Sequence, residues 1–184
     1  MSAIASRRQL HVSLLRWVCV TVPFLLLLGF LSGRSVPAGD QNGWYLALAK
    51  PAGTPPGWLF PAVWSLLYVA TGVALAVVLN ARGAQGRWVA VLAFAVQFAL
   101  NLAWTPVFFG AHHIAAAAVL VAAIFVVALV ATLLFGRIRP FAAWLMVPYL
   151  AWLCYAGALT WGIGHLNPGA ESLAPSATST QIIP

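Results

Sequence analysis

The sequence predicts an all-α membrane protein, a bundle of five transmembrane helices, and three observations support that class. Of the 184 residues, 63% are hydrophobic and only 6% are charged, whereas soluble domains carry about 25% charged residues. The apolar residues gather in five runs, each near the roughly 20 residues that a helix needs to cross the hydrocarbon core. Short polar links separate most of the runs. Such a chain needs lipid as the solvent of its outer surface.

The first helix is expected at Val12–Ser32, after a basic segment of residues 1–11. Basic residues before a short apolar stretch also resemble a secretory signal, and Ser6-Arg7-Arg8 is weakly similar to a twin-arginine signal. Because no clear small-residue cleavage site follows, a helix retained in the mature protein is favoured.

The other four helices are expected at Leu59–Asn80, Trp88–Phe109, Ile114–Phe135 and Phe141–His165. The links between them are so short that neighbouring helices must be antiparallel. The loop 33–58 is the exception, and loops of that length are usually functional or disordered. Residues 12–167 therefore form one transmembrane domain. The Ser/Thr/Ala/Pro-rich residues 168–184 are expected to be a disordered tail.

The formal net charge of +7 indicates topology here, because the basic residues fall between the apolar runs and form no stripe that would suit nucleic acid. With five crossings, one side of the membrane holds Arg7, Arg8, Arg16, Arg82, Arg87, Arg137 and Arg139. The other side holds only Arg34 and Lys50, together with the acids Asp40 and Glu171. The positive-inside rule then places the N-terminus in the cytoplasm and the C-terminus outside, in the inner cell membrane.

The runs contain almost no ionisable groups: apart from Arg16, no Asp, Glu, Lys or Arg lies within them. Ion-coupled transporters place such groups at membrane depth, and hydrolysis needs a positioned acid and base. No spacing suits a metal, so neither a metal site nor a required cofactor is expected. Cys19 and Cys154 are expected to be buried as small hydrophobic residues.

The third run has two opposite faces. One carries polar and aromatic residues at i, i+4, i+7 and i+11, namely Gln97, Asn101, Trp104 and Phe108, and should line the bundle interior. The other carries Ala95, Ala99 and Ala103, a small-xxx-small pattern that suits a dimer interface. Simple internal packing in an alanine-rich protein explains the same pattern.

Similar stripes occur in the second run (Phe60, Trp64, Tyr68 and Thr71) and in the fifth run (Trp152, Ala156 and Thr160). Aromatic stripes in membrane proteins also fill cores or form interface belts. Because three such stripes occur together with an aromatic loop, a ligand pocket is as well supported as core filling or an interface belt. An apolar pocket with a few polar groups would suit a large flat ligand.

Four motifs occur in order: Trp44-Tyr45 followed by Lys50-Pro51, then PPGWLFPAVW at 55–64, QFALNLAWTPVFFG at 97–110, and VPYLAW at 147–152 with a final Leu166-Asn167. Over about Trp44–Asn167 they resemble the TspO/MBR family, which comprises bacterial tryptophan-rich sensory proteins and the mitochondrial translocator protein, or peripheral benzodiazepine receptor. The resemblance implies five transmembrane helices, frequent dimers and a pocket closed by the first loop.

The resemblance also implies a membrane receptor or regulator that binds porphyrins such as protoporphyrin IX or haem, linked to tetrapyrrole homeostasis and to oxygen or stress signalling. The alternatives are a light-dependent porphyrin-degrading enzyme, a porphyrin transporter, or a structural membrane subunit. Carried over by position, Tyr45 faces the ligand, Trp64 and Trp152 match the pocket tryptophans, and Asn101 and Trp104 form a wall. The expected ligand-binding residues are Tyr45, Pro55, Pro56, Phe60, Trp64, Tyr68, Gln97, Asn101, Trp104, Phe108, Trp152, Ala156 and Thr160.

The chain departs from the family pattern at three points. Gly53 stands where the family often has tryptophan, and Thr160 where many members have asparagine. Neither Tyr149 nor Tyr155 is followed within five residues by Lys or Arg, which argues against sterol binding.

Overall fold

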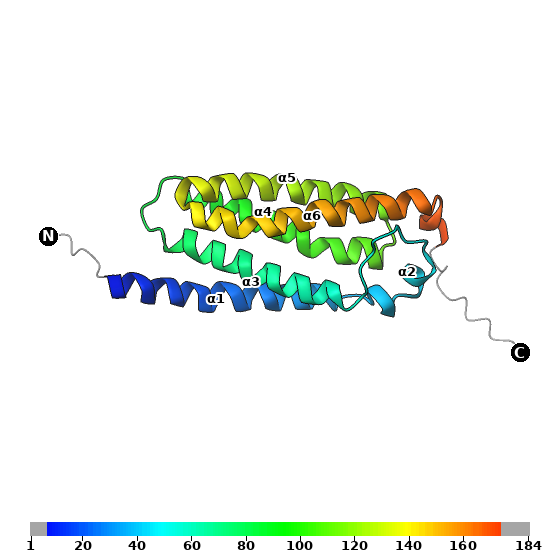
Figure 1. Cartoon of the computed structure of the whole chain (residues 1–184), viewed down its shortest axis with the longest axis horizontal. Coiled ribbons are helices and arrows are strands. Elements are labelled where there is room, and N and C mark those ends of the chain that lie inside the picture. The colour runs from blue at the N-terminus through cyan, green and yellow to red at the C-terminus, as the bar shows by residue number, and fades with distance from the viewer. Residues whose placement is uncertain (1–6, 174–184) are drawn as a thin grey trace, which may run out of the picture.

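A computed structural model describes residues 7–173 and contains five helices long and apolar enough to cross a membrane, which confirms the predicted fold class. They are α1 (Arg7–Gly33), α3 (Leu59–Asn80), α4 (Arg87–Thr105), α5 (Ile114–Ile138) and α6 (Pro140–Leu166). The long loop carries a 3-10 turn η1 (Gly39–Gln41) and the short helix α2 (Gly43–Ala47). Both lie at the end of the bundle where α6 finishes, hereafter the loop end (Figure 1).

α1 begins at Arg7, five residues before the expected Val12, and two other boundaries differ from the expected ones at prolines. α5 continues to Ile138, so the expected link 136–140 shrinks to Arg139 alone. Arg139 is extended, at φ −150° and ψ 108°, because the ring of a following proline disfavours helical backbone at that position. Pro140 then opens α6, where its missing N–H costs no hydrogen bond.

Pro106 ends the regular part of α4, and a π-helical turn η2 (Pro106–Gly110) follows it. A helical residue at position 106 would donate its N–H to the carbonyl of Leu102, but proline has none. The hydroxyl of Ser32, at the end of α1, donates to that carbonyl at 2.6 Å instead. The interruption of α4 therefore supplies a polar contact between α1 and α4.

α1 lies at the edge of the bundle and packs mainly on α3. Of an 18-residue apolar stretch of α1, only 17% is buried, against 39% for the corresponding stretch of α3. The two helices approach closely at Gly72, where an added Cβ would lie 3.0 Å from the Cα of Val22. The hydroxyl of Thr21 donates to the carbonyl of Gly72 at 2.8 Å. Most of the outward surface of α1 is left to lipid.

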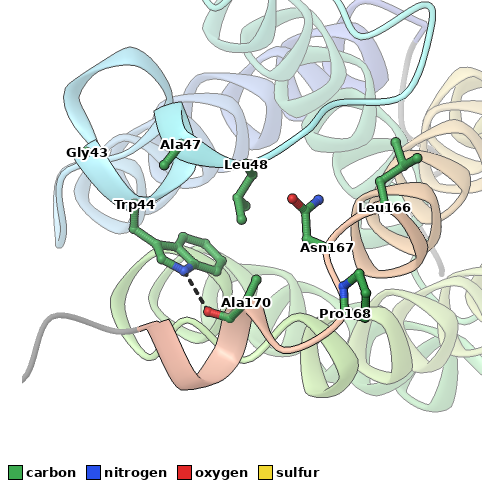
Figure 2. A pocket seen from close by; sticks show the side chains of 8 residues that line it. All are labelled: Gly43, Trp44, Ala47, Leu48, Leu166, Asn167, Pro168 and Ala170. Carbon is green, nitrogen blue, oxygen red and sulfur yellow. Dashed lines mark hydrogen bonds between the residues drawn. The ribbon is translucent and has the colours of Figure 1, made fainter.

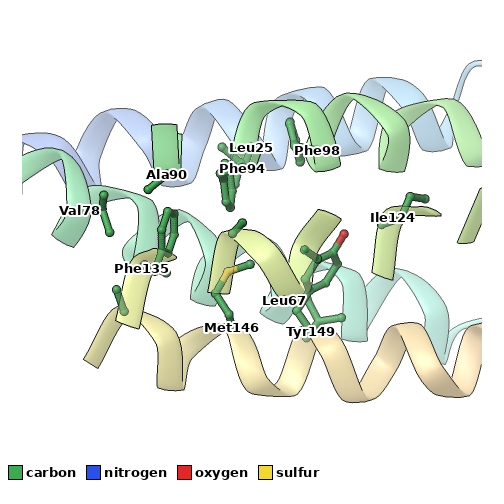
Figure 3. Packing of buried hydrophobic residues seen from close by; sticks show 14 of the residues in the cluster. Leu25, Leu67, Val78, Ala90, Phe94, Phe98, Ile124, Phe135, Met146 and Tyr149 are labelled. Carbon is green, nitrogen blue, oxygen red and sulfur yellow. The ribbon is translucent and has the colours of Figure 1, made fainter. Parts of the chain in front are cut away.

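The buried side chains form two clusters. The central cluster joins all five long helices and includes Phe94, Phe135 and Met146 (Figure 3). The loop-end cluster comprises Trp44, Tyr45, Leu48, Phe108, Ile114, Ala117, Ile163 and Ala170. Trp104 packs against both clusters, so the core is continuous from the membrane segments to the loop.

Two expectations about surface and tail need correction. Cys19 and Cys154 are exposed on the outside of the bundle rather than buried, since a small apolar side chain is as well placed against lipid as inside the protein. The expected tail begins as ordered structure, because Ala170–Leu173 form a 3-10 turn and the Trp44 indole donates to the Ala170 carbonyl at 3.1 Å. The remainder of the tail, 174–184, and residues 1–6 lie outside the described residues.

Candidate ligand-binding site

A small, partly open cavity of about 40 Å³ lies between α3, α4, α5 and α6. Its lining residues are Phe60, Trp64, Asn101, Trp104, Val121, Ile124, Trp152, Leu153 and Ala156. Three of its walls are tryptophan rings, each from a different helix. A cavity of this size holds only a few water-sized groups, whereas pockets for drug-sized ligands are about 300–1,000 Å³. A larger ligand could enter only if the helices that form the walls moved apart.

Two hydrogen-bond donors at this cavity have no acceptor. The indole nitrogens of Trp104 and Trp152 are buried and lack a partner among the described residues. Such orphans are rare, because a buried unpaired donor costs about 1–3 kcal/mol. Both tryptophans line the same cavity. The site therefore suits a ligand that brings hydrogen-bond acceptors into an aromatic enclosure.

Two tyrosine hydroxyls near the cavity are already paired with side-chain amide oxygens. The Tyr68 hydroxyl donates to Asn101 Oδ1 at 2.9 Å, and the Tyr149 hydroxyl donates to Gln97 Oε1 at 2.7 Å. These bonds join α3 to α4 and α6 to α4 within the membrane segments. Removing one partner would leave the other unsatisfied in an apolar interior. They fix the three helices around the cavity, while the indole N–H groups stay available.

The aromatic rings make a continuous set of contacts. The Trp64 centroid lies 5.4 Å from Tyr68, 6.3 Å from Tyr149 and 6.5 Å from Trp152. The ring of Trp104 is stacked on Phe108 at 4.9 Å and 8°. Offset and edge-to-face contacts at these distances are favourable, and they hold the indoles in defined orientations.

Six of the predicted site residues line the cavity: Phe60, Trp64, Asn101, Trp104, Trp152 and Ala156. Tyr68 and Gln97 lie one layer behind, where they pair as described above. Thr160 is buried but donates its hydroxyl to the Ala156 carbonyl at 2.8 Å. Because that bond lies within α6, the Thr160 hydroxyl has no free donor to offer a ligand.

The remaining predicted residues lie toward the loop. Tyr45 and Phe108 belong to the loop-end cluster, and the Tyr45 ring packs on Phe109 at 5.3 Å. Tyr45 is thus separated from the cavity by Phe108 and Trp104. Pro55 and Pro56 lie in the loop segment leading to α3 and do not line the cavity. Their roles in ligand binding stay predictions that require the loop to move.

Tyr45 is neutral at physiological pH. Burial, and to a lesser extent the negative charge of Asp40, raise its pKa above the ordinary value of 10.0. The ammonium group of Lys50 lies 4.6 Å from the centre of its ring, a cation–π contact. The loop tyrosine therefore acts as a neutral packing group.

Sequence reasoning missed Val121, Ile124 and Leu153, which complete the cavity wall. Val121 and Ile124 come from α5, where Thr132 is the only polar residue before Arg137, so little polar contrast marks its inner face. Leu153 follows Trp152 directly and lies on the buried side of α6.

The two predicted faces of α4 point in opposite directions. Gln97 and Asn101 are buried, whereas Ala95 and Ala99 are exposed and Ala103 is half-buried. The alanine face is therefore available on the outside of the bundle, at least for its first two residues.

A second, more open hollow of about 480 Å³ lies at the loop end, between α2 and the end of α6 (Figure 2). Its lining is mostly apolar and includes Trp44, Leu48 and Pro168. Its polar side-chain donors are already used: the Trp44 indole binds Ala170, and both donors of Asn167 bind backbone carbonyls. The hollow offers shape, but it lacks the free donors found at the inner cavity.

Metal ligands do not gather at either site. Within residues 7–173, no group of three or more His, Cys, Asp and Glu side chains lies close enough to hold an ion. His112 instead stacks on Trp44 at 4.4 Å.

Comparisons with known proteins identify the family of the chain. The TspO/MBR family model matches residues 19–166. Protein CrtK of Rhodobacter capsulatus is 37% identical over 135 residues, which are 73% of this chain and 84% of the relative. The tryptophan-rich protein TspO of Chlorobaculum tepidum is 35% identical over 152 residues, 82% of this chain and 96% of the relative. The translocator protein of Sus scrofa is 36% identical over 143 residues, 77% of this chain and 84% of the relative. The chain is therefore a membrane protein that belongs to the TspO/MBR family.

Proposed function

We propose that this protein is a membrane receptor or regulator that binds porphyrins in the tryptophan-lined cavity. The main observation that supports this proposal is that the indole N–H groups of Trp104 and Trp152 are buried and have no acceptor among the described residues. A porphyrin is flat and apolar, so it can lie against indole rings, and its ring nitrogens or carboxylates supply the acceptors that the donors lack. Binding must expand a cavity of about 40 Å³, which makes it slower than simple diffusion into an open site.

The test is quenching of tryptophan fluorescence by protoporphyrin IX in detergent-solubilised protein. Trp152→Ala and Trp64→Ala should each weaken binding, whereas Trp144→Ala should not. Trp144 is a matched control because it lies on the same helix as Trp152 but is 72% exposed on the outside of the bundle. Equal affinity in all three variants would refute the proposed site.

A second function, light-dependent breakdown of the bound porphyrin, has one supporting observation. The rings of Trp64 and Trp152 meet edge to face at the cavity, 6.5 Å apart, so a porphyrin between them would touch two oxidisable indoles. Illumination of the complex in air decides the matter: loss of the porphyrin spectrum with a new product supports an enzyme. A porphyrin that persists supports a receptor that binds only.

The link to tetrapyrrole homeostasis and to oxygen or stress signalling is part of the same proposal. Its support is that relatives carry the name tryptophan-rich sensory protein, as in Cereibacter sphaeroides. The expected phenotype of a deletion strain is an altered porphyrin content that depends on oxygen supply, restored by the wild-type gene but not by the Trp152→Ala variant.

The proposed orientation has the N-terminus in the cytoplasm and the loop end outside the inner membrane. Support comes from the arginines that cluster at the opposite end of the bundle, including Arg82, Arg87 and Arg137. Reporter fusions at both termini would show on which side of the membrane each terminus lies and so test this orientation.

The alanine face of α4 is the proposed surface for a homodimer. Ala95 and Ala99 are exposed there, and small side chains allow two helices to approach closely. Ala99→Leu should reduce the dimer fraction in mass measurements on detergent complexes, while Ala118→Leu on α5 should not.

A further inference from the structure

Two short links between long helices lie at the end of the bundle opposite the loop end, hereafter the arginine end (Figure 1). The link between α3 and α4 holds Arg82 and leads into Arg87, while Arg137 and Arg139 lie at the junction of α5 and α6. The chain has only two acidic residues, and both lie at the loop end, one in η1 and the other in the 3-10 turn after α6. The protein itself therefore supplies no negative side chain to balance the arginine end.

Two of these four arginines have a structural task. Arg87 Nη1 donates to the Leu79 carbonyl at 3.2 Å, and Arg139 Nη1 donates to the Ile138 carbonyl at 2.9 Å. Both carbonyls lie in the last turns of α3 and α5, where backbone acceptors lack a partner within their own helix. The Arg87 guanidinium also lies 4.7 Å from the centre of the Trp88 ring. These two arginines therefore close helix ends.

The other two, Arg82 and Arg137, have no such task. Both are exposed, and neither guanidinium has a hydrogen-bond or ion-pair partner within residues 7–173. A guanidinium presents its N–H donors in a fixed planar fork, which matches two oxygens of a phosphate group at once. These two side chains are therefore free to bind a phosphate that comes from outside the protein.

Exposed tryptophans place the arginine end at the depth of lipid headgroups. Trp144 and Trp161 are 72% and 70% exposed on α6, and the 17 residues between them span about 26 Å of helix. That length is close to the hydrocarbon core of about 30 Å, and tryptophan prefers the two membrane interfaces. Arg139 precedes Trp144 by about 8 Å along the helix axis. Since the headgroup layer is about 5–8 Å thick on each side, Arg139 and its neighbours lie among the phosphate groups.

An apolar stripe continues from the arginine end toward the middle of the membrane. On α4, the side chains of Trp88, Leu92 and Val96 are all exposed at the spacing i, i+4 and i+8, so they share one outward face. A phospholipid has the matching form, with a charged headgroup above an apolar chain. A free phosphate ion could use the arginines but would leave this stripe uncovered. The combination therefore favours a lipid as the partner.

We propose that the arginine end binds anionic phospholipids, with Arg82 and Arg137 pairing with headgroup phosphates and the exposed stripe of α4 contacting an acyl chain. The headgroup must carry a net negative charge, because a zwitterionic headgroup brings a cation that offsets its phosphate. This interaction goes beyond the proposed function, since it involves the outer surface of the bundle and not the tryptophan-lined cavity.

The experiment measures lipid binding to the full chain in detergent by native mass spectrometry. Dimyristoylphosphatidylglycerol is the anionic probe, and dimyristoylphosphatidylcholine is the zwitterionic one. Arg82→Gln and Arg137→Gln should each lower the affinity for the anionic lipid by about fivefold, the contribution of one basic residue near a membrane surface. The affinity for the zwitterionic lipid should change by less than about twofold. Arg34→Gln removes the same charge at the loop end and is the matched control, so both affinities should stay as in the wild type.

Three results would overturn the inference. Unchanged affinity for the anionic lipid in both link variants would show that these guanidinium groups do not bind it. An equal loss in Arg34→Gln would show an effect of net charge rather than of place. Displacement of the lipid by inorganic phosphate at the same concentration would assign the arginines to a free anion. The porphyrin test stays separate: neither Arg82 nor Arg137 lines the cavity, so quenching by protoporphyrin IX should be the same in both variants as in the wild type.

Discussion

The buried, unpaired indole N–H groups of Trp104 and Trp152 predict that replacing either residue by phenylalanine should be tolerated better than the same change at Trp64, whose N–H is not among the buried unpaired donors. The perturbation is Trp152→Phe or Trp104→Phe, each of which deletes a buried N–H that has no acceptor among the described residues. Trp64→Phe is the control, because Trp64 lines the same cavity but is not one of the two unpaired donors.

The magnitude follows from two opposing terms. Losing the smaller ring of the indole leaves a void of about 40 Å³, which costs about 1 kcal/mol at roughly 24 cal/mol per Å³. Deleting the unpaired donor recovers about 1–3 kcal/mol of desolvation penalty. The free energy of unfolding should therefore fall by about 1 kcal/mol in Trp64→Phe and stay level or rise in the other two variants. The affinity for a ligand that carries hydrogen-bond acceptors should fall by about 2- to 10-fold for each donor that is lost.

The assay is reversible unfolding in mixed micelles, followed by far-UV circular dichroism so that the tryptophan content does not affect the signal. An equal loss of stability in all three variants would refute the reasoning, because it would mean that the two donors carry no penalty. A stabilised Trp152→Phe variant with unchanged porphyrin affinity would separate the penalty from ligand binding and remove the main support for the proposed site.

Three further outcomes are expected. Gly72→Ala should destabilise the protein by about 1–3 kcal/mol, because the new Cβ would meet α1 backbone at 3.0 Å; Gly157→Ala, with its nearest contact at 3.6 Å, should be nearly neutral in the same unfolding assay. Tyr149→Phe should cost about 1–2 kcal/mol by stranding the Gln97 carbonyl, and a double-mutant cycle with Gln97→Leu should recover part of that loss. Since burial raises the pKa of Tyr45, the unfolded chain loses that proton first, so stability should hold below pH 10 and fall as pH rises above it. Tyr45→Phe should flatten this fall in thermal unfolding measured against pH.

Much of the bundle could be predicted from the sequence because membrane helices leave strong one-dimensional signals. The division of α4 into a polar-aromatic face and an alanine face was correct: Gln97 is buried and Ala95 exposed. That prediction needed only the helical period of about 3.6 residues. The same periodicity placed Trp64 and Trp152 on stripes of α3 and α6, and the family resemblance assigned both to the pocket; both line the cavity.

The rest could not be predicted because it depends on contacts distant in the chain. The bond between Ala49 and Asn167 joins residues 118 positions apart, and no local pattern encodes such a partner. The direction of the short helix α2 decides that Tyr45 packs on Phe109 rather than at the cavity. α5 contributed Val121 with little signal, since Thr132 is its only polar residue before Arg137 and a nearly uniform apolar helix scarcely reveals its inner face.

Pro106, directly after α4, has a consequence for which substitutions the first helix tolerates. α1 is held by hydroxyl groups at two levels, Thr21 on the carbonyl of Gly72 and Ser32 on the carbonyl of Leu102. Both acceptors are main-chain atoms, which persist under substitution of their own side chains. Homologous chains should therefore be able to exchange nearly every lipid-facing residue of this segment, provided that a small hydroxylated residue recurs at each level and the break at Pro106 is kept.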